Sequence, residues 1–336
     1  MKRFVLIVLL IGVLVTLFLA SYAKKYFNEQ REAISSDKKL IIVEIKSGTS
    51  IKDIGIILQE KKLLRSSSFF SWYLKLWVKI GIVKAGTYEL SPSMTLDEII
   101  DILKNGKIAR RWITIPEGYR LEQIAERLSD NKYVSKKEFI KRAIVKNFSS
   151  SFLKGLTPNT SLEGFLFPDT YDIGLNPTVD SIINQMLINF NRKTVLLRNK
   201  KVGNLTFYQI LTLASIVERE SSSSDDRKGI AGVYINRLSI SMALQSDATI
   251  EYLTKKHDPT PSLADTKIES LYNTYLHSGL PPTPISNPGI DAILSTINYE
   301  KHDYLYFLTS ILTDSKTIFS KTYQEHLENR RKYISQ

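Results

Sequence analysis

The stretch that decides the fold of the larger part of this chain reads TFYQILTLASIVERE and runs from Thr206 to Glu220. As an α-helix it places Leu211, Ala214 and Glu218 on one face, because side chains three and four positions apart lie together on a helix. An apolar face of this kind packs into a protein core. We therefore predict a core helix here that carries one carboxyl group, that of Glu218, on its buried side.

A glutamate on a buried helix face is a candidate for proton transfer. Apolar surroundings disfavour the charged form of a carboxyl group and raise its pKa, which keeps the acid protonated near neutral pH. The structural alternative is that Glu218 forms an ion pair with Arg219 or has a capping role at the end of the helix. The helix by itself does not separate these two interpretations.

Glu220 is the nearest second carboxylate in the sequence, but helical geometry separates it from Glu218. Residues two positions apart point roughly 200° away from each other. Enzymes that cleave a sugar bond between two carboxylates hold them about 5–9.5 Å apart. If Glu218 does such chemistry, either one carboxyl group performs both proton transfers, or Glu163, Asp169 or Asp247 supplies the second. For Glu163 and Asp169, turn and cap roles are the structural alternative.

The composition and the motifs exclude several other kinds of chemistry. The chain has 336 residues and no cysteine, so it has no disulfide bond, thiolate metal site or cysteine nucleophile. Its histidines, at positions 257, 277, 302 and 326, show no metal-binding spacing, and no serine elbow or glycine-rich nucleotide loop is present. We therefore expect no cofactor and no bound metal, and carboxylate chemistry is the class that the sequence favours.

The net charge of +12 suits a chain that works near anionic surfaces or polymers. Lysine and arginine are spread along the chain, and no nucleic-acid-binding motif is present. We therefore expect no nucleic-acid partner and interpret the charge as a solvated surface.

An apolar run near the N-terminus, residues 4–23, is long enough to cross a bilayer core of about 30 Å. Basic residues flank it on both sides. A cleaved signal peptide is the alternative, but the run is longer than the roughly 7–15 apolar residues of a signal peptide. We therefore predict a single-pass cell-membrane anchor at 4–23, a cytoplasmic tip at 1–3, and a tether at 24–40 that leads to the rest of the chain outside the cytoplasm.

A sequence pattern recurs in this chain at an offset of 70 residues. Residues 43–58 and 113–128 each alternate apolar and polar residues, turn at a glycine, and then place apolar residues at helical spacing, which predicts a strand, a turn and a helix. Residues 86–90 are strand-like and residues 94–103 are helical. We therefore predict an α+β module at residues 41–112, followed by a second domain.

A proline-rich stretch, residues 279–289, reads GLPPTPISNPG and predicts a stiff loop. Such a loop is either a rigid connector or one wall of a binding groove. In the second case, Asn273, Ser286 and Asn287 offer the hydrogen-bond donors and acceptors that a sugar requires.

Six motifs, in order along the chain, carry a resemblance to a known family. They are LEGFLFPDTY at residues 162–171, LASIVERE at 213–220, YINRL at 234–238, LQSD at 244–247, YNTY at 272–275 and GLPP at 279–282. Together they resemble the YceG-like family of endolytic murein transglycosylases. The match runs from the apolar N-terminal run to the C-terminus.

The resemblance implies a lytic transglycosylase, a lyase that cleaves the bond between N-acetylmuramic acid and N-acetylglucosamine of peptidoglycan without water. Glu218 stands where the family has its catalytic glutamate. That residue protonates the leaving oxygen and then accepts the proton of the muramoyl C6 hydroxyl as a 1,6-anhydro ring closes. One acid therefore suffices. The implied setting is nascent glycan strands at the membrane, with peptidoglycan synthases as partners, so that cleavage ends strand elongation.

The resemblance also implies a fold and a set of binding residues. The α+β fold would comprise the transmembrane helix, a LysM-like βααβ module at 41–112, and a mostly helical, lysozyme-related catalytic domain at 113–336. LysM-like modules often hold N-acetylated sugars, and sugar binding by this one stays open. The matched motifs give the expected substrate-binding residues as Glu163, Tyr171, Arg237, Gln245, Asp247, Asn273, Tyr275, Ser286 and Asn287.

The chain departs from the family pattern at Ala248, Thr283 and Thr317, where the family often has proline, glycine and histidine. The first two changes would reshape sugar subsites, and the third puts a polar role at that position in doubt. Two alternatives to the transglycosylase stay open. One is a muramidase-type hydrolase, with water positioned by Asp247 or Glu163. The other is a non-catalytic scaffold that binds the cell wall.

Overall fold

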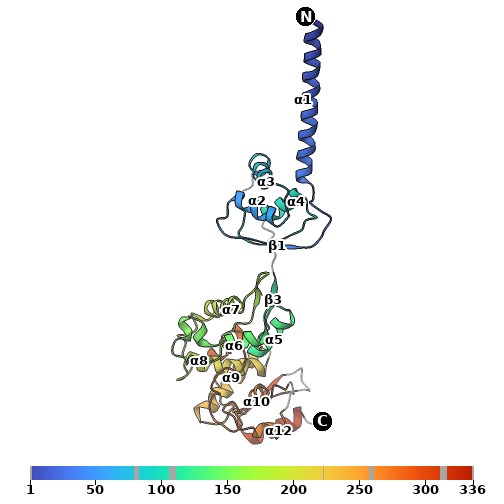
Figure 1. The fold of residues 1–336 in the computed structure, drawn as a ribbon. Coiled ribbons are helices and arrows are strands. Elements are labelled where there is room, and N and C mark those ends of the chain that lie inside the picture. Colours follow the sequence, from blue (N-terminus) through green and yellow to red (C-terminus); the bar gives the residue numbers. More distant parts are fainter. Residues whose placement is uncertain are drawn as a thin grey trace. The chain divides into compact units, whose positions relative to one another are not determined.

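The computed structural model describes residues 2–78, 83–105, 111–221, 223–256, 261–310 and 316–334, with side chains from residue 9 onward. Figure 1 shows helices and strands divided between two units, Met1–Arg111 and Trp112–Gln336. The predicted mixture of helices and strands is confirmed. Each unit has a hydrophobic core of its own and is described by itself.

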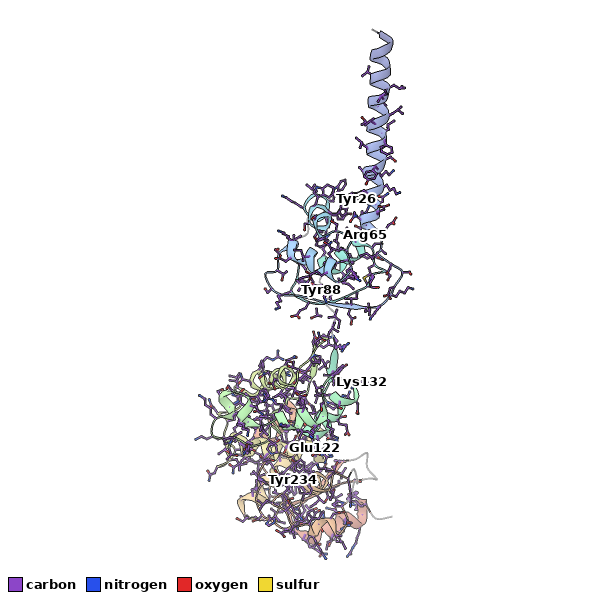
Figure 2. All side chains as sticks on the ribbon, viewed as in Figure 1. Tyr26, Arg65, Tyr88, Glu122, Lys132 and Tyr234 are labelled. Carbon is purple, nitrogen blue, oxygen red and sulfur yellow. The ribbon has the colours of Figure 1, made fainter. Side chains whose placement is uncertain are left out.

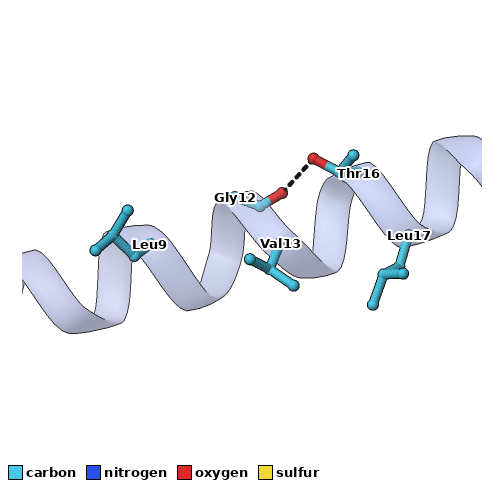
Figure 3. Close-up of a pocket in the computed structure, with 5 residues that line it drawn as sticks. All are labelled: Leu9, Gly12, Val13, Thr16 and Leu17. Atoms are coloured by element: carbon cyan, nitrogen blue, oxygen red, sulfur yellow. Dashed lines mark hydrogen bonds between the residues drawn. The ribbon is translucent and has the colours of Figure 1, made fainter.

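The first unit begins with the long helix α1 (Lys2–Arg31). Its segment Leu9–Arg31 is long and apolar enough to span a membrane, and the apolar part of the segment is not buried in the protein. Thr16, in the middle of the apolar run, donates its hydroxyl to the Gly12 carbonyl at 2.7 Å (Figure 3). This bond satisfies the hydroxyl inside the helix, as an apolar environment requires.

Helix α1 continues beyond the apolar run and into the segment that we predicted as a tether, residues 24–40. Two side chains of this last part bind the rest of the unit. The Phe27 ring packs into its core, and Arg31 Nη2 lies 2.5 Å from Asp97 Oδ2. These contacts give residues 24–31 a reason to stay helical that the polar sequence alone did not reveal. Met1, in the predicted cytoplasmic tip, lies outside the described residues.

The rest of the first unit is a small sheet covered by short helices. Its elements are β1 (Ile41–Ile45), α2 (Ile51–Glu60), α3 (Ser67–Tyr73), the π-helix η1 (Leu74–Val78), β2 (Gly86–Leu90) and α4 (Leu96–Asn105). β1 and β2 pair antiparallel, with Val43 opposite Tyr88. Both of these side chains are fully buried against the helices. Figure 2 labels Tyr88. Residues 79–82 and 106–110 of the predicted module lie outside the described residues.

The described residues of the second unit form mainly helices, together with the antiparallel strand pairs β3–β4 and β5–β6. Its elements are β3 (Trp112–Thr114), α5 (Leu121–Asp130), α6 (Lys136–Arg142), η2 (Val145–Asn147), η3 (Ser151–Leu153), β4 (Thr170–Asp172), α7 (Val179–Thr194), α8 (Phe207–Glu220), α9 (Ser224–Ser239), α10 (Asp247–Thr254), η4 (Asp265–Lys267), α11 (Ile290–Ile297), β5 (Tyr306–Thr309), β6 (Thr317–Ser320) and α12 (Tyr323–Tyr333).

The strand–turn–helix pattern that recurs in the sequence forms in both units. β1 leads through Gly48 into α2, and β3 leads through Gly118 into α5. The two glycines have φ angles of +83° and +73°. Such angles are costly for a residue with a Cβ atom, which explains why both turns use glycine.

Helix α8 is the centre of the second unit, because α9, α10 and α11 all pack against it. Every side chain from Ile210 to Val217 is buried. Thr206 caps its start, accepting from Gln209 N at 3.3 Å, while Gln209 Oε1 accepts from Thr206 N at 2.9 Å. The core helix that we predicted over this stretch is confirmed.

Candidate active site

Glu218 lies in the last turn of α8 with its side chain only 5% exposed. One carboxyl oxygen, Oε1, accepts a hydrogen bond from Arg227 Nη2 at 2.5 Å, and the other, Oε2, accepts from the backbone N–H of Gly289 at 2.8 Å. A Cβ atom on Gly118 would lie 3.3 Å from Glu218 Cγ. The carboxyl group is therefore fixed from three sides, by α9, by the residue before α11 and by the turn before α5.

Arg227, in the first part of α9, is shared between two carboxylates. Besides Glu218, it binds Asp291 Oδ2 through Nη1 at 2.7 Å, and its Nε donates to the Ser221 carbonyl at 2.8 Å. Burial raises the pKa of Asp291, but hydrogen bonds from Arg227 and Ser224 outweigh it, so the pKa is lowered and Asp291 is ionised. Its negative charge offsets that of Arg227, which can then orient Glu218 without forcing it to ionise.

Burial raises the pKa of Glu218 to about 7, against the opposing hydrogen bond of Gly289 and the charge of Arg227. The carboxylates of Glu117 and Asp291 add to the rise, since each disfavours another negative charge nearby. A carboxyl group with such a pKa can donate a proton near neutral pH and take one back afterwards.

Glu117, like Asp291, is a carboxylate that reasoning from the sequence missed. It is exposed and has no ion-pair partner among the described residues. A Cβ atom on Gly289 would overlap its carboxyl group. Because the N–H of the same glycine binds Glu218, the two carboxyl groups lie near each other. The signal that could have found Glu117 is its place in Ile115-Pro116-Glu117-Gly118, at the turn of the second strand–turn–helix copy.

The two neighbours of Glu218 on α8 point elsewhere, as helical geometry predicts. Arg219 binds Glu251 at 2.6 Å and donates to the Gly118 carbonyl at 3.2 Å, so it is not the partner of Glu218. Glu220 accepts from Ser246 Oγ at 2.5 Å and from Tyr234 Oη at 2.8 Å. Burial raises its pKa, although both hydrogen bonds oppose the rise.

Two of the predicted binding residues, Glu163 and Asn287, are buried next to each other. The Glu163 carboxyl group accepts from Leu121 N and from Asn287 Nδ2, each at 2.8 Å. Burial raises its pKa to about 8. Asn287 Oδ1 accepts from the backbone N–H groups of Gly164 and Leu166. These bonds tie the loop before α11 to the turn before α5.

This arrangement also positions the turn against Glu218. The backbone of Asn287 forms two hydrogen bonds with the turn, each of 2.9 Å: its carbonyl accepts from the N–H of Gly118, and its N–H donates to the carbonyl of Tyr119. All polar atoms of the Asn287 amide group bind protein. Its observed role is to hold the turn, and contact with substrate stays a prediction.

Four further predicted binding residues are also buried and bonded to protein. The Tyr171 hydroxyl donates to the Phe167 carbonyl, and Ser286 Oγ donates to the Ser215 carbonyl. Arg237 donates to the carbonyl groups of Leu244 and Leu305, and Asn273 to those of Thr266 and Ile268. The structure does not bring these four side chains to Glu218.

Of the remaining three, Gln245 is exposed, whereas Asp247 and Tyr275 are half-buried. The Tyr275 hydroxyl donates to Asp247, and Gln245 N donates to the Thr274 carbonyl at 2.9 Å. Burial raises the pKa of Asp247. Gln245 is exposed and has a φ of +49°, an unusual angle for a residue other than glycine. Their contact with substrate stays a prediction.

The three departures from the family pattern have different surroundings. Ala248 is buried in α10, and Thr283 Oγ1 forms a hydrogen bond with Tyr272 Oη at 2.8 Å. Thr317 is buried in β6, and its hydroxyl has no hydrogen-bond partner among the described residues. Over those same residues, no cluster of three or more potential metal ligands occurs.

Comparisons with known proteins place residues 43–332 in the family described as the YceG-like family. A protein of Streptococcus pneumoniae (strain ATCC BAA-255 / R6), named endolytic murein transglycosylase, is 35% identical over 330 residues, or 90% of this chain. This chain spans only 60% of that relative, and the same share of a second pneumococcal relative. A protein of Bacillus subtilis (strain 168) with the same name is 34% identical over 320 residues, and the match covers 90% of this chain and 88% of that relative.

A solved structure is also similar. The crystal structure of a yceG-like protein from Listeria monocytogenes is 36% identical to this chain, with a TM-score of 0.58. The match covers 87% of this chain and 99% of the crystallised one.

Proposed function

The chain belongs to the YceG-like family, and from this premise we propose that it is an endolytic peptidoglycan lytic transglycosylase, with Glu218 as its catalytic acid and base. The family membership predicted from the six motifs is thereby confirmed. The activity is that named for the pneumococcal and Bacillus subtilis relatives. The observation that carries the proposal is the buried Glu218 carboxyl group, fixed by Arg227 and Gly289, with a pKa of about 7.

The proposed reaction uses Glu218 twice. As an acid, it gives its proton to the glycosidic oxygen while the bond from that oxygen to C1 of N-acetylmuramic acid breaks. As a carboxylate, it then takes the proton from the C6 hydroxyl of the same sugar, while the oxygen of this hydroxyl bonds to C1. One strand then ends in 1,6-anhydro-N-acetylmuramic acid, and the other regains a free hydroxyl on N-acetylglucosamine. No water is consumed, and Glu218 finishes protonated.

The surroundings of Glu218 suit this double role. The Gly289 N–H stabilises the carboxylate after the first proton transfer, and burial favours return of the proton. Arg227 holds the carboxyl group in one orientation, with its own charge offset by Asp291. Glu117 is exposed beside this group, where a bound glycan strand would pass.

The finer assignments belong to the same proposal. The module at 41–112 is LysM-like, and the segment 113–336 is a lysozyme-related catalytic domain. The chain is anchored at 4–23, with its N-terminus in the cytoplasm and its catalytic domain outside, where peptidoglycan synthases extend the strands. The apolar α1 and the helix-rich second unit support these assignments.

Mass spectrometry of digested peptidoglycan tests the proposal. The full chain, purified in detergent, should release internal fragments that carry 1,6-anhydro-N-acetylmuramic acid ends. Glu218→Gln should lower the rate by about 10²–10⁴-fold, the usual contribution of a general acid. Reducing ends would instead identify a hydrolase, and an absence of products would identify a wall-binding scaffold. Full activity of Glu218→Gln would refute the assignment of this residue.

A further inference from the structure

Around the end of α1, aromatic rings from two segments gather. The ring of Phe27 lies 5.6 Å from Phe69, 6.4 Å from Trp72 and 5.7 Å from Trp77, measured between centroids. Tyr26, labelled in Figure 2, lies 6.2 Å from Phe69. The end of the apolar helix is therefore packed directly against α3 and η1.

One side of α3 and η1 packs into the first unit and the other does not. Phe69 and Tyr73 are buried, whereas Trp72 is 46%, Leu76 56% and Trp77 66% exposed. Residues five apart lie about 140° apart round an α-helix. The π turn of η1, whose hydrogen bonds join residues five apart, brings Trp72 and Trp77 towards one side. Both rings accordingly contact Phe27.

The position of Phe27 along α1 sets the depth of these rings. The apolar run ends at Ala23, and four residues at about 1.5 Å each place Phe27 about 6 Å beyond the hydrocarbon. The headgroup layer on each side of a bilayer is about 5–7 Å thick. If α1 spans the membrane, then Phe27, and with it Trp72 and Trp77, lies in the headgroup layer.

Charge and attachment agree with that depth. Lys24, Lys25 and Lys75 are exposed in the same two segments, and at this depth a lysine can lay its apolar stem along the membrane and keep its charged end among the headgroups. Arg31 binds Asp97 on α4 and lies over the Phe27 ring at 5.6 Å, so the end of α1 is fixed to the unit. The unit therefore cannot swing away from the bilayer on a flexible tether at this point.

We propose that the exposed side of α3 and η1, which we term the aromatic collar (Trp72, Leu76 and Trp77), is a lipid-binding surface that inserts into the headgroup layer of the membrane spanned by α1. Tryptophan favours this layer, because its ring is apolar and its indole N–H can bond to headgroups or water. The collar gives the first unit a second membrane attachment and fixes it against the bilayer surface. This inference requires that α1 spans the membrane and does not depend on catalysis.

The chain offers a direct test, because it has three tryptophans. Trp72 and Trp77 lie in the collar, while Trp112 begins the second unit and is 54% exposed. Three double variants leave one tryptophan each: Trp77→Phe with Trp112→Phe, Trp72→Phe with Trp112→Phe, and Trp72→Phe with Trp77→Phe. Each full chain is reconstituted in vesicles of phosphatidylcholine and phosphatidylglycerol, and vesicle flotation checks insertion.

Fluorescence quenching then measures the depth of each ring. Lipids brominated near the headgroup should lower the fluorescence of Trp72 and Trp77 at least twofold. Iodide in the aqueous phase should lower their fluorescence less than it does in the same chain unfolded in denaturant without detergent. Iodide should quench Trp112 strongly, as an exposed reference. Strong iodide quenching and no bromine quenching of Trp72 and Trp77 would overturn the proposal. Protection of both from both quenchers, as burial against a second protein copy would give, would also overturn it, and so would failure to float.

Discussion

At the scale of single residues, the charge of Glu117 is the feature near Glu218 that can be changed without disturbing the core. Its carboxylate raises the pKa of Glu218, although burial of Glu218 is the larger cause. Glu117 has no ion-pair partner among the described residues. Glu117→Gln removes that charge, so the pKa of Glu218 should fall. Activity that needs protonated Glu218 declines as pH rises through this pKa, and the decline should therefore begin at lower pH in the variant.

The size of the shift is limited because Glu117 is exposed and screened by water and salt. We expect about 0.3–1 pH unit in the alkaline limb of kcat, larger at low ionic strength. Glu138→Gln, at an exposed position on α6, is the control and should leave the profile in place. A profile that moves equally in both variants, or in neither, would show that Glu117 does not act on Glu218.

Whether the sequence can predict a part of the site depends on how far apart along the chain the contacting residues are. The face of α8 that carries Glu218 follows from spacing within fifteen residues, and it was predicted correctly. The groups around its carboxyl come from more distant segments: Glu117, Gly289 and Asp291. Their closeness depends on how the loop before α11 meets the turn before α5, and no local pattern encodes that.

At the scale of elements, the turn at Gly118 is what brings the β3–α5 connection against Glu218. Gly118→Ala would strain a backbone with φ of +73° and push a methyl group to 3.3 Å from Glu218 Cγ. The strain should cost about 1–2 kcal/mol of unfolding free energy. The displaced carboxyl group should lower kcat roughly tenfold, since a misplacement of about 1 Å can cost 10²-fold.

Gly174, between β4 and α7, provides a matched control. Its φ is +68°, and a Cβ atom there would meet nothing within 4 Å. Gly174→Ala should lose a similar unfolding free energy in urea and keep the wild-type kcat. If the two variants lose stability and activity in parallel, the Gly118 turn acts on the fold alone and not on Glu218.

The loops show why motif residues are harder to assign than helices. Asn273, Ser286 and Asn287 are polar residues in a loop and were predicted to face a sugar. In the structure their side chains instead donate hydrogen bonds to backbone carbonyl groups, those of Ile268, Ser215 and Tyr119 respectively. They therefore supply partners that these carbonyl groups need. The sequence pattern is the same for a loop that lines a binding groove and for a loop whose side chains form structural hydrogen bonds.

At the scale of the whole molecule, the two units have separate cores, and we expect their stabilities to depend on pH differently. Burial raises the pKa of Glu163 to about 8 and that of Glu218 to about 7, and both belong to the second unit. Both values exceed the unfolded value of about 4.3. Each group therefore favours the folded state below about pH 4 and loses this contribution as pH rises through its folded pKa. Burial also raises the pKa of Glu220 and of Asp247, which adds to the trend. Burial lowers the pKa of His326, which opposes it.

Among the described residues of the first unit outside α1, the groups whose pKa burial raises are Tyr73 and Tyr88, and phenols ionise above the range of pH 5 to 8. Hydrogen bonds from Thr95 lower the pKa of Glu98, so its contribution is complete above about pH 5. Unfolding of the full chain in detergent should therefore show two transitions, since separate cores do not unfold as one. From pH 5 to 8, the unfolding free energy of the second unit should fall by an amount on the order of a few kcal/mol, so its transition should move to a lower urea concentration. The transition of the first unit should stay in place.

The single-tryptophan variants separate the two transitions. Trp77 reports the first unit and Trp112 the second. Adding Glu218→Gln should reduce the pH dependence seen at Trp112, because an amide does not ionise, while Glu163 maintains the rest of it. The pH dependence seen at Trp77 should stay unchanged. A single transition shared by both tryptophans would mean that the two units unfold together. An unchanged slope at Trp112 would mean that Glu218 does not have a raised pKa, and its role as a proton donor near neutral pH would then lose its physical basis.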